Sequence, residues 1–244
     1  RDVERSRGLG DVYKRQLYSM PTDEFRTQME YLKENGYKTI KLGDYASRRK
    51  AGDSFHKECV LIFDDGYLDN LTNAAPIMKE YGYIGNMFMA GMYEGWPGYL
   101  TWDEEVKLAQ YGWELGSHTY IHKPLPLLSR QERKADLKKS HDHMLGLYYS
   151  PNGVTLSYPN GAYNKEVVED VKEAGYAAGV TGLIGTNTEQ DGLLTLRRVN
   201  VFHHKAKNLE HFKRALYKAQ LISWVNEKTG YDLNRFLLWY YHKK

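Results

Sequence analysis

The apolar residues Val60-Leu61-Ile62-Phe63 run directly into Asp64-Asp65-Gly66-Tyr67, and this junction indicates both a fold class and the place of a site. A continuous apolar run predicts a buried strand, and polar groups directly after it are typical of a strand that ends in a site. Two adjacent carboxylates repel each other unless a positive group, such as a metal ion, lies beside them. The alternative is a simple turn, in which Asp caps the next helix and Gly takes a positive φ.

Predicted strands and helices alternate along the chain. Periodic apolar positions and caps predict helices at 22–35, 70–81, 101–111, 129–147, 164–174 and 208–220. Apolar runs predict strands at 59–63, 83–89, 113–115, 154–157, 176–180 and 199–202. We expect Thr22 to cap the first helix, and Thr101 with Glu104 to form a capping box. Because long helices separate the strands, parallel pairing follows, as in a (β/α) barrel or a doubly wound α/β sheet.

The composition argues against several classes of protein. With 244 residues and 41% hydrophobic content, the chain can bury one sizeable core, which predicts a single domain. The net charge of +3 is small and evenly spread, so no nucleic-acid partner is expected. No apolar run approaches about 18 residues, so no membrane span is expected. The single cysteine, Cys59, excludes an internal disulfide and a cysteine-rich zinc site.

The two ends of the chain differ from its middle. Residues 1–16 (RDVERSRGLGDVYKRQ) lack apolar periodicity and look like translated adaptor sequence, so we treat them as a non-native leader. No signal peptide is visible. The expected domain covers 17–220. The segment 221–244 is rich in Trp, Tyr and Leu, and we expect it to be a C-terminal helical extension packed on that domain.

A second motif, Gly116-Ser117-His118-Thr119-Tyr120-Ile121-His122, places two histidines four residues apart after a short predicted strand. On a helical turn this spacing puts both imidazoles on one face, as two ligands of one ion require. One Asp with two His leaves the open position of a catalytic zinc-type site. The second acid is then free to act as a general base toward water that the ion activates, which predicts hydrolysis.

These two motifs resemble those of the polysaccharide deacetylases, the NodB-homology group of carbohydrate esterase family 4. The resemblance covers about 20–216 and includes the segments 73–77 and 100–103. It implies a distorted (β/α)7 barrel, an extracellular or cell-surface location, and removal of N-acetyl, sometimes O-acetyl, groups from glycans. By motif position, Asp64 would be the general base, and the metal ligands would be Asp65, His118 and His122. The ligand types favour zinc, with cobalt or nickel as alternatives.

A third motif, Leu156-Ser157-Tyr158-Pro159-Asn160-Gly161, resembles the Tyr-Pro-Tyr-Gly sequence of the poly-N-acetylglucosamine deacetylase-like branch. The resemblance implies that the Asn160 backbone N–H helps to hold the oxyanion, a role that tolerates a changed side chain. A plain Pro-Asn-Gly turn is the alternative. Many members carry an arginine two positions before the proline, where this chain has Ser157. We expect Arg198 to approach Asp64 instead, the alternative being a surface residue.

The general acid is less well marked. The family's late histidine is assigned to His203, with His204 as the alternative, although the usual Leu-x-His context is absent. His141 and His143 are interpreted as solvated groups of a charged helix. Sugar rings have apolar faces that aromatic side chains can cover, and we select Trp96 in the loop 91–98 over the other nearby aromatic residues, Tyr93, Tyr99, Tyr120 and Tyr163.

The sequence therefore predicts a metal-dependent hydrolase that removes N-acetyl groups from a polysaccharide containing N-acetylglucosamine. One alternative keeps the fold but changes the substrate to an O-acetyl ester or a small cyclic amide. Another is a glycan-binding protein that has lost turnover, because the usual arginine is replaced and the acid is not clearly placed.

Overall fold

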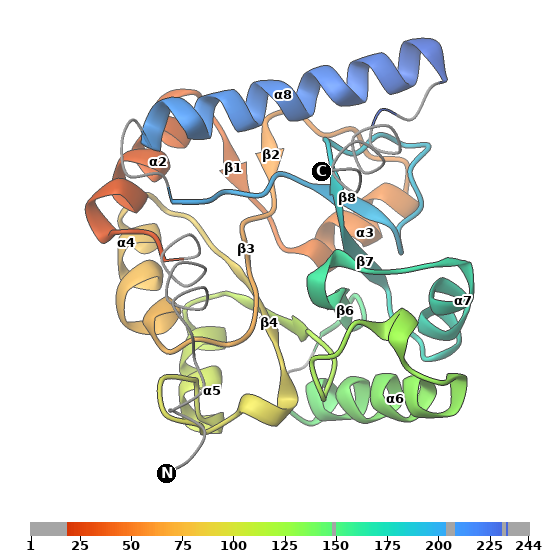
Figure 1. Ribbon diagram of the computed structural model, residues 1–244. Helices are drawn as coiled ribbons and strands as arrows, with labels where there is room; N and C mark the ends of the chain where they lie inside the picture. Colours follow the sequence, from red (N-terminus) through yellow and green to blue (C-terminus); the bar gives the residue numbers. More distant parts are fainter. Residues whose placement is uncertain (1–18, 148–149, 204–207, 231–232, 234–244) are drawn as a thin grey trace, which may run out of the picture.

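The computed structural model describes residues 19–147, 150–203, 208–230 and 233. At its centre lies a curled sheet of parallel strands covered by helices (Figure 1). The strands follow one another across the sheet in chain order: β3 (Ile62–Phe63), β4 (Asn86–Met89), β5 (Glu114–Ser117), β6 (Thr155–Ser157), β7 (Ala178–Ile184) and β8 (Leu196–Arg198). This half-barrel confirms the predicted α/β class and parallel pairing.

Helices connect the strands and pack on the outside of the sheet (Figure 1). They are α2 (Thr22–Glu34), α3 (Leu42–Lys50), α4 (Ala75–Glu80), α5 (Trp102–Gln110), α6 (Arg130–Leu147), α7 (Lys165–Glu173) and α8 (Asn208–Thr229). A π-helical turn, Asn70–Ala74, leads into α4. The predicted capping box is present at the start of α5. Thr22 is the first residue of α2 rather than its cap, because Pro21 occupies the cap position without a side-chain bond.

The strand predicted at 59–63 is two strands in two sheets. Cys59 belongs to β2 (Glu58–Cys59), which pairs with β1 (Lys38–Thr39), whereas Ile62 and Phe63 form β3. The side chains of β3 are half-buried rather than buried, because β3 is an edge strand of the large sheet. The apolar run therefore crosses from one sheet to the next.

Two further predictions need correction near the carboxyl end. Residues 199–202 are not a strand, and the last strand, β8, lies just before them. The helix expected to stop at residue 220 continues to Thr229, so α8 crosses the expected boundary between the domain and its extension. The expected leader at 1–16 lies outside the described residues, as does 234–244. No described helix is long and apolar enough to cross a membrane.

The sheet positions the site because its parallel strands all end at one edge. Every residue of the interior strands β4, β5 and β6 is buried, in a core that includes Met87, Leu115 and Leu156. Each motif predicted to carry chemistry follows the carboxyl end of one strand. Asp64 and Asp65 follow β3, His118 follows β5, and the Pro159 turn follows β6.

Candidate active site

Asp65, His118 and His122 form one cluster at the carboxyl edge of the sheet. One potential ligand atom from each lies within 4.8 Å of the other two. Asp65 Oδ1 is 3.4 Å from His118 Nε2 and 3.0 Å from His122 Nε2. The structure thus brings together the three residues expected to bind a metal ion.

The protonation of His118 shows why this cluster fits a cation. Its Nδ1 lies 2.7 Å from the Ser157 carbonyl oxygen, and a carbonyl only accepts, so Nδ1 carries the hydrogen. Burial lowers the pKa of His118, although Asp64 and Asp65 lie nearby. The ring is therefore neutral at neutral pH, and the Nε2 lone pair faces the Asp65 carboxylate. A divalent cation satisfies these facing acceptors, and Asp-His-His is a donor set of catalytic zinc sites.

The two histidines meet without a helix. Residues 118–122 form a bend in which Thr119 and His122 have φ values of 63° and 52°. Asp65, in the turn after β3, has a φ of 74°. Non-glycine residues rarely adopt this left-handed region, and such strain clusters at functional sites. The His122 N–H donates to Thr119 Oγ1 at 3.2 Å, which helps to hold the bend. The four-residue spacing correctly predicted that His118 and His122 lie close together, but they lie on a bend and not on a helical turn.

Asp64 has different partners from Asp65. Its Oδ2 accepts a hydrogen bond of 2.7 Å from Arg198 Nη1, whereas its Oδ1 is buried without a hydrogen-bond partner among the described residues. Burial alone raises the pKa of this carboxyl, but the neighbouring His118 and the permanently charged Arg198 guanidinium hold the pKa of Asp64 below its ordinary value. Asp64 is therefore an ionised carboxylate whose Oδ2 is fixed by Arg198, and the Ser157 side chain also lowers its pKa.

A bulge in β7 holds Arg198 in place. The register between β7 and β8 shifts between Val180 and Ile184, which leaves the Thr181 carbonyl free to accept from Arg198 Nε at 2.9 Å. Arg198 is thus bound at one end of its guanidinium to the backbone and at the other to Asp64. Arg198 on β8 thus contacts Asp64, as expected, whereas position 157 holds a serine.

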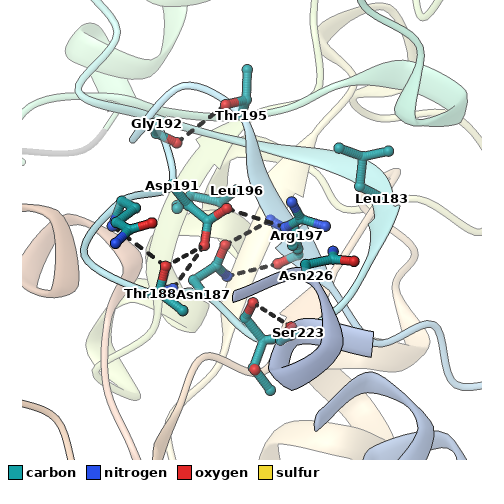
Figure 2. A network of polar contacts seen from close by, with 12 residues as sticks. Leu183, Asn187, Thr188, Asp191, Gly192, Thr195, Leu196, Arg197, Ser223 and Asn226 are labelled. Atoms are coloured by element: carbon teal, nitrogen blue, oxygen red, sulfur yellow. Dashed lines mark hydrogen bonds and ion pairs between the residues drawn. The ribbon is translucent and has the colours of Figure 1, made fainter. Parts of the chain in front are cut away.

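The neighbouring Arg197 belongs to a separate polar network between the β7–β8 loop and α8 (Figure 2). Asn187 clamps its backbone, donating to Arg197 O at 2.9 Å and accepting from Arg197 N at 2.8 Å. Arg197 Nε donates to Asp191 Oδ1 at 3.1 Å. Successive side chains of a strand point to opposite faces. Because the Arg197 side chain is held on the face of β8 toward Asp191, the next side chain, Arg198, points to the opposite face, toward Asp64.

The third motif forms a tight turn at Pro159–Gly161. Asn160 has a φ of 55° and Gly161 a φ of 66°. A Cβ added to Gly161 would lie 2.3 Å from the Cα of Gly182 in the β7 bulge, so only glycine fits there. The turn expected to carry the Asn160 N–H thus rests directly on the bulge that holds Arg198.

The predicted proton donor, His203, has two polar partners that are not members of the cluster. His203 Nδ1 lies 3.1 Å from Glu24 Oε2 at the start of α2 and 3.4 Å from Asn208 Nδ2 at the start of α8. This position gives no support for the catalytic assignment of His203, and the alternative His204 lies outside the described residues. His141 and His143 are partly buried, so their interpretation as solvated groups is wrong.

The aromatic side chain of Tyr93 contacts His122, and Trp96 packs on Tyr93. Trp96 is 51% exposed, and its ring centroid lies 5.4 Å from that of Tyr93. The Tyr93 hydroxyl is 3.3 Å from Nδ1 of His122, a candidate ligand residue, and the sequence pattern did not reveal this contact. Tyr120 instead lies beneath Lys139, and Tyr163 packs against Tyr158.

Comparison with known proteins identifies polysaccharide deacetylases as relatives of this chain. A family model described as polysaccharide deacetylase matches residues 51–179. The protein YxkH of Bacillus subtilis (strain 168), itself assigned to the polysaccharide deacetylases, is 35% identical over 186 residues, which make up 75% of this chain and 65% of that protein. The poly-β-1,6-N-acetyl-D-glucosamine N-deacetylase of Staphylococcus epidermidis is 29% identical over 179 residues, 67% of this chain and 61% of that enzyme. The chain thus spans less than two thirds of the length of either relative.

A solved structure shares the fold. The Streptococcus pyogenes deacetylase PplD, solved in complex with acetate, superposes with a TM-score of 0.70 at 24% sequence identity. The match covers 79% of this chain and 85% of PplD. The half-barrel with its covering helices is therefore an architecture that this deacetylase also has.

Proposed function

Because the chain belongs to the polysaccharide deacetylase family, we propose that it is a metal-dependent hydrolase that removes N-acetyl groups from a polysaccharide containing N-acetylglucosamine. The observation that carries this proposal is the division of labour between adjacent acids. Asp65 faces two histidines, while Asp64 is ionised, held by Arg198 and not part of that cluster. The name of the S. epidermidis relative supports an N-acetylglucosamine polymer as the substrate class.

Asp65, His118 and His122 would hold the ion. A bound divalent cation supplies a Lewis acid that polarises the acetyl carbonyl and lowers the pKa of water. Zinc suits this donor set, and cobalt and nickel are the alternatives because geometry, rather than ligand type alone, separates them. Ser157 contributes through its carbonyl oxygen, which fixes the tautomer of His118 and aims Nε2 at the cluster.

Asp64 moves the proton in this scheme. Its carboxylate takes a proton from water as the oxygen attacks the acetyl carbon, and Arg198 keeps the carboxylate oriented. The Asn160 N–H donates to the carbonyl oxygen as negative charge develops there. The C–N bond then breaks, and the leaving nitrogen needs one proton. We assign its delivery to Asp64 as well, because His203 is bound to Glu24. The products are acetate and a free amine.

A panel of substrates tests the proposal, with acetate release as the readout for the acetylated substrates and ring opening as the readout for the hydantoin. The panel holds β-1,6-linked and β-1,4-linked N-acetylglucosamine oligomers, acetylated xylan and a hydantoin, each with chelator and with zinc, cobalt or nickel restored. We expect metal-dependent acetate release from the N-acetylglucosamine oligomers. Turnover of only the xylan ester or the hydantoin would replace the proposal with one of those substrates. Oligomer binding without acetate release under every metal would indicate a binding protein. An extracellular or cell-surface location follows from this substrate and is part of the same proposal.

A further inference from the structure

We propose that Asp136 on α6 is a positioning residue for the cluster of Asp65, His118 and His122. Its carboxylate holds the bend 118–122, and the bend places His122 beside Asp65. The affinity of the cluster for a divalent cation then depends on a residue that is not a member of it. This inference rests on the proposed metal-dependent function, because that function supplies the cation.

The bend between the two histidines is strained. Thr119 and His122 both have left-handed backbone angles, which non-glycine residues adopt only at a cost in free energy. Such residues persist where their surroundings fix them more strongly than the strain opposes them. The position of the His122 imidazole therefore depends on the groups that hold the bend from outside.

Asp136 holds the bend from α6. The residue is 5% exposed, and its Oδ1 accepts a hydrogen bond of 2.9 Å from the Ile121 N–H. Burial raises the pKa of Asp136, and donors of the bend, the Thr119 hydroxyl among them, act against that rise. Thr119 Oγ1 in turn accepts from the His122 N–H at 3.2 Å. Asp136 thus reaches His122 by two routes, through the backbone at Ile121 and through the Thr119 side chain.

A buried chain of hydroxyl groups supports the bend from the same helix. Ser117 Oγ accepts from the Thr119 N–H at 3.1 Å. The Tyr176 hydroxyl lies 3.1 Å from Ser117 Oγ and 2.8 Å from Ser140 Oγ on α6. Asp136 and Ser140 are four residues apart, so they share one face of α6. Polar groups on a buried helix face cost free energy unless they are paired, and here both connect to the segment that carries the histidines.

The test is a zinc titration of the chelator-treated apoprotein, in competition with a chromophoric chelator. Asp136→Asn keeps the size of the side chain but brings an amide NH₂ group against the donors of the bend. It should weaken zinc binding about tenfold, as is typical of groups that orient a metal ligand. Thr119→Val removes the hydroxyl between Asp136 and His122 and should weaken zinc binding by a similar factor. Thr119→Ser keeps the hydroxyl and should bind zinc as wild type does.

A double variant tests whether Asp136 acts through Thr119. Because the two side chains lie on one route to His122, Asp136→Asn combined with Thr119→Val should lose less affinity than the product of the two single losses. Losses that multiply in full would overturn this route. If Asp136→Asn does not fold, the pair Thr119→Val and Thr119→Ser decides, and equal zinc affinity in these two would overturn the proposal.

Two further variants of α6 are the controls. Asp142→Asn makes the same change of charge at an exposed position. Leu137→Ala removes a completely buried side chain and lowers stability, but it leaves the hydrogen bonds to the bend in place. Both should bind zinc as wild type does, with the folded fraction measured by thermal unfolding of each apoprotein. Equal weakening in Leu137→Ala and Asp136→Asn would indicate a general loss of stability and overturn the positioning role. Wild-type zinc affinity in Asp136→Asn would overturn it as well.

The titration also separates this inference from the proposed function. Wild-type protein that binds zinc but releases no acetate would overturn the deacetylase proposal, and the comparison of Asp136→Asn with its controls would still decide the positioning role. Wild-type protein that binds neither zinc, cobalt nor nickel would overturn both.

Discussion

Arg198 Nη1 lies 2.7 Å from Asp64 Oδ2, and this bond joins the two outermost strands of the sheet. Asp64 follows β3 at one edge, and Arg198 ends β8 at the other. The curl of the sheet brings these edges close enough for one side chain to span them. The orientation of the proposed base therefore depends on the tertiary fold and not on a neighbour in the sequence.

Replacing Arg198 by Met should lower kcat about 10- to 100-fold, because the Asp64 carboxylate loses its orienting donor. Zinc content, measured by elemental analysis, should not change, since Arg198 does not contact the cluster residues. Arg198→Lys should recover little of the lost kcat, because an ammonium group cannot reproduce the planar guanidinium that bonds both Asp64 and the Thr181 carbonyl. Arg26→Met, which breaks an exposed ion pair with Glu80, is the control. Wild-type kcat in Arg198→Met would refute the orienting role.

The adjacent acids should respond differently to the same substitution. Asp64→Asn should abolish turnover and retain the metal, because Asp64 is bound by Arg198 and lies outside the cluster. Asp65→Asn should weaken zinc binding about 10- to 100-fold or more, since it removes the charged ligand. Both are tested by titrating zinc into the apoprotein and by acetate release at saturating zinc. Equal loss of zinc affinity in the two variants would contradict the assigned roles.

Much of this site is predictable from the chain because its parts follow strand ends. Parallel strands share one carboxyl edge, so Asp65 and His118 had to lie near each other once both were placed after strands. The spacing of His118 and His122 indicated proximity, although the bend that achieves it depends on two left-handed residues, Thr119 and His122, that no propensity marks. We expected Arg198 to approach Asp64, and the structure adds the bulge that directs it.

Other features depend on contacts between distant segments. His203 contacts Glu24, a partner 179 residues away that depends on how α2 packs beside α8. The strands β1 and β2 have two residues each, too few to show an alternating pattern. The bond from Tyr93 to His122 likewise depends on the path of a loop. Such contacts between distant segments are not encoded in the local sequence.

Because Gly161 and Gly182 are in contact, a methyl group added at Gly182 should affect catalysis. A Cβ on Gly182 would lie 3.3 Å from the Gly161 Cα, so the turn that carries Asn160 must move by a few tenths of an ångström. Gly182→Ala should therefore lower kcat about three- to tenfold and leave KM and zinc content unchanged. Gly146→Ala, where a Cβ meets nothing within 4 Å, is the control. An unchanged kcat in Gly182→Ala would show that the position of this turn does not limit catalysis.

Glu105 carries a further, separable prediction about stability. Its side chain on α5 is completely buried, and neither carboxyl oxygen has a hydrogen-bond partner among the described residues. Burial, with a smaller contribution from nearby Glu94, raises the pKa of Glu105 to about 9. Between its ordinary value of 4.5 and about 9, the folded protein holds a proton that the unfolded chain has released. The free energy of unfolding therefore falls as pH rises through this window, by at most about 1.4 kcal/mol per pH unit.

Glu105→Gln removes this proton and should flatten the pH dependence. The variant should match wild type near pH 5 and be the more stable protein at pH 8, by about 1–3 kcal/mol once relaxation around the buried group is allowed for. Urea unfolding at pH 5, 6.5 and 8 measures the difference. Glu30→Gln, an exposed position on α2 with the same change in charge, controls for the overall charge. Parallel pH profiles for wild type and Glu105→Gln would mean that Glu105 is ionised in the folded protein and has a partner that stabilises its charge.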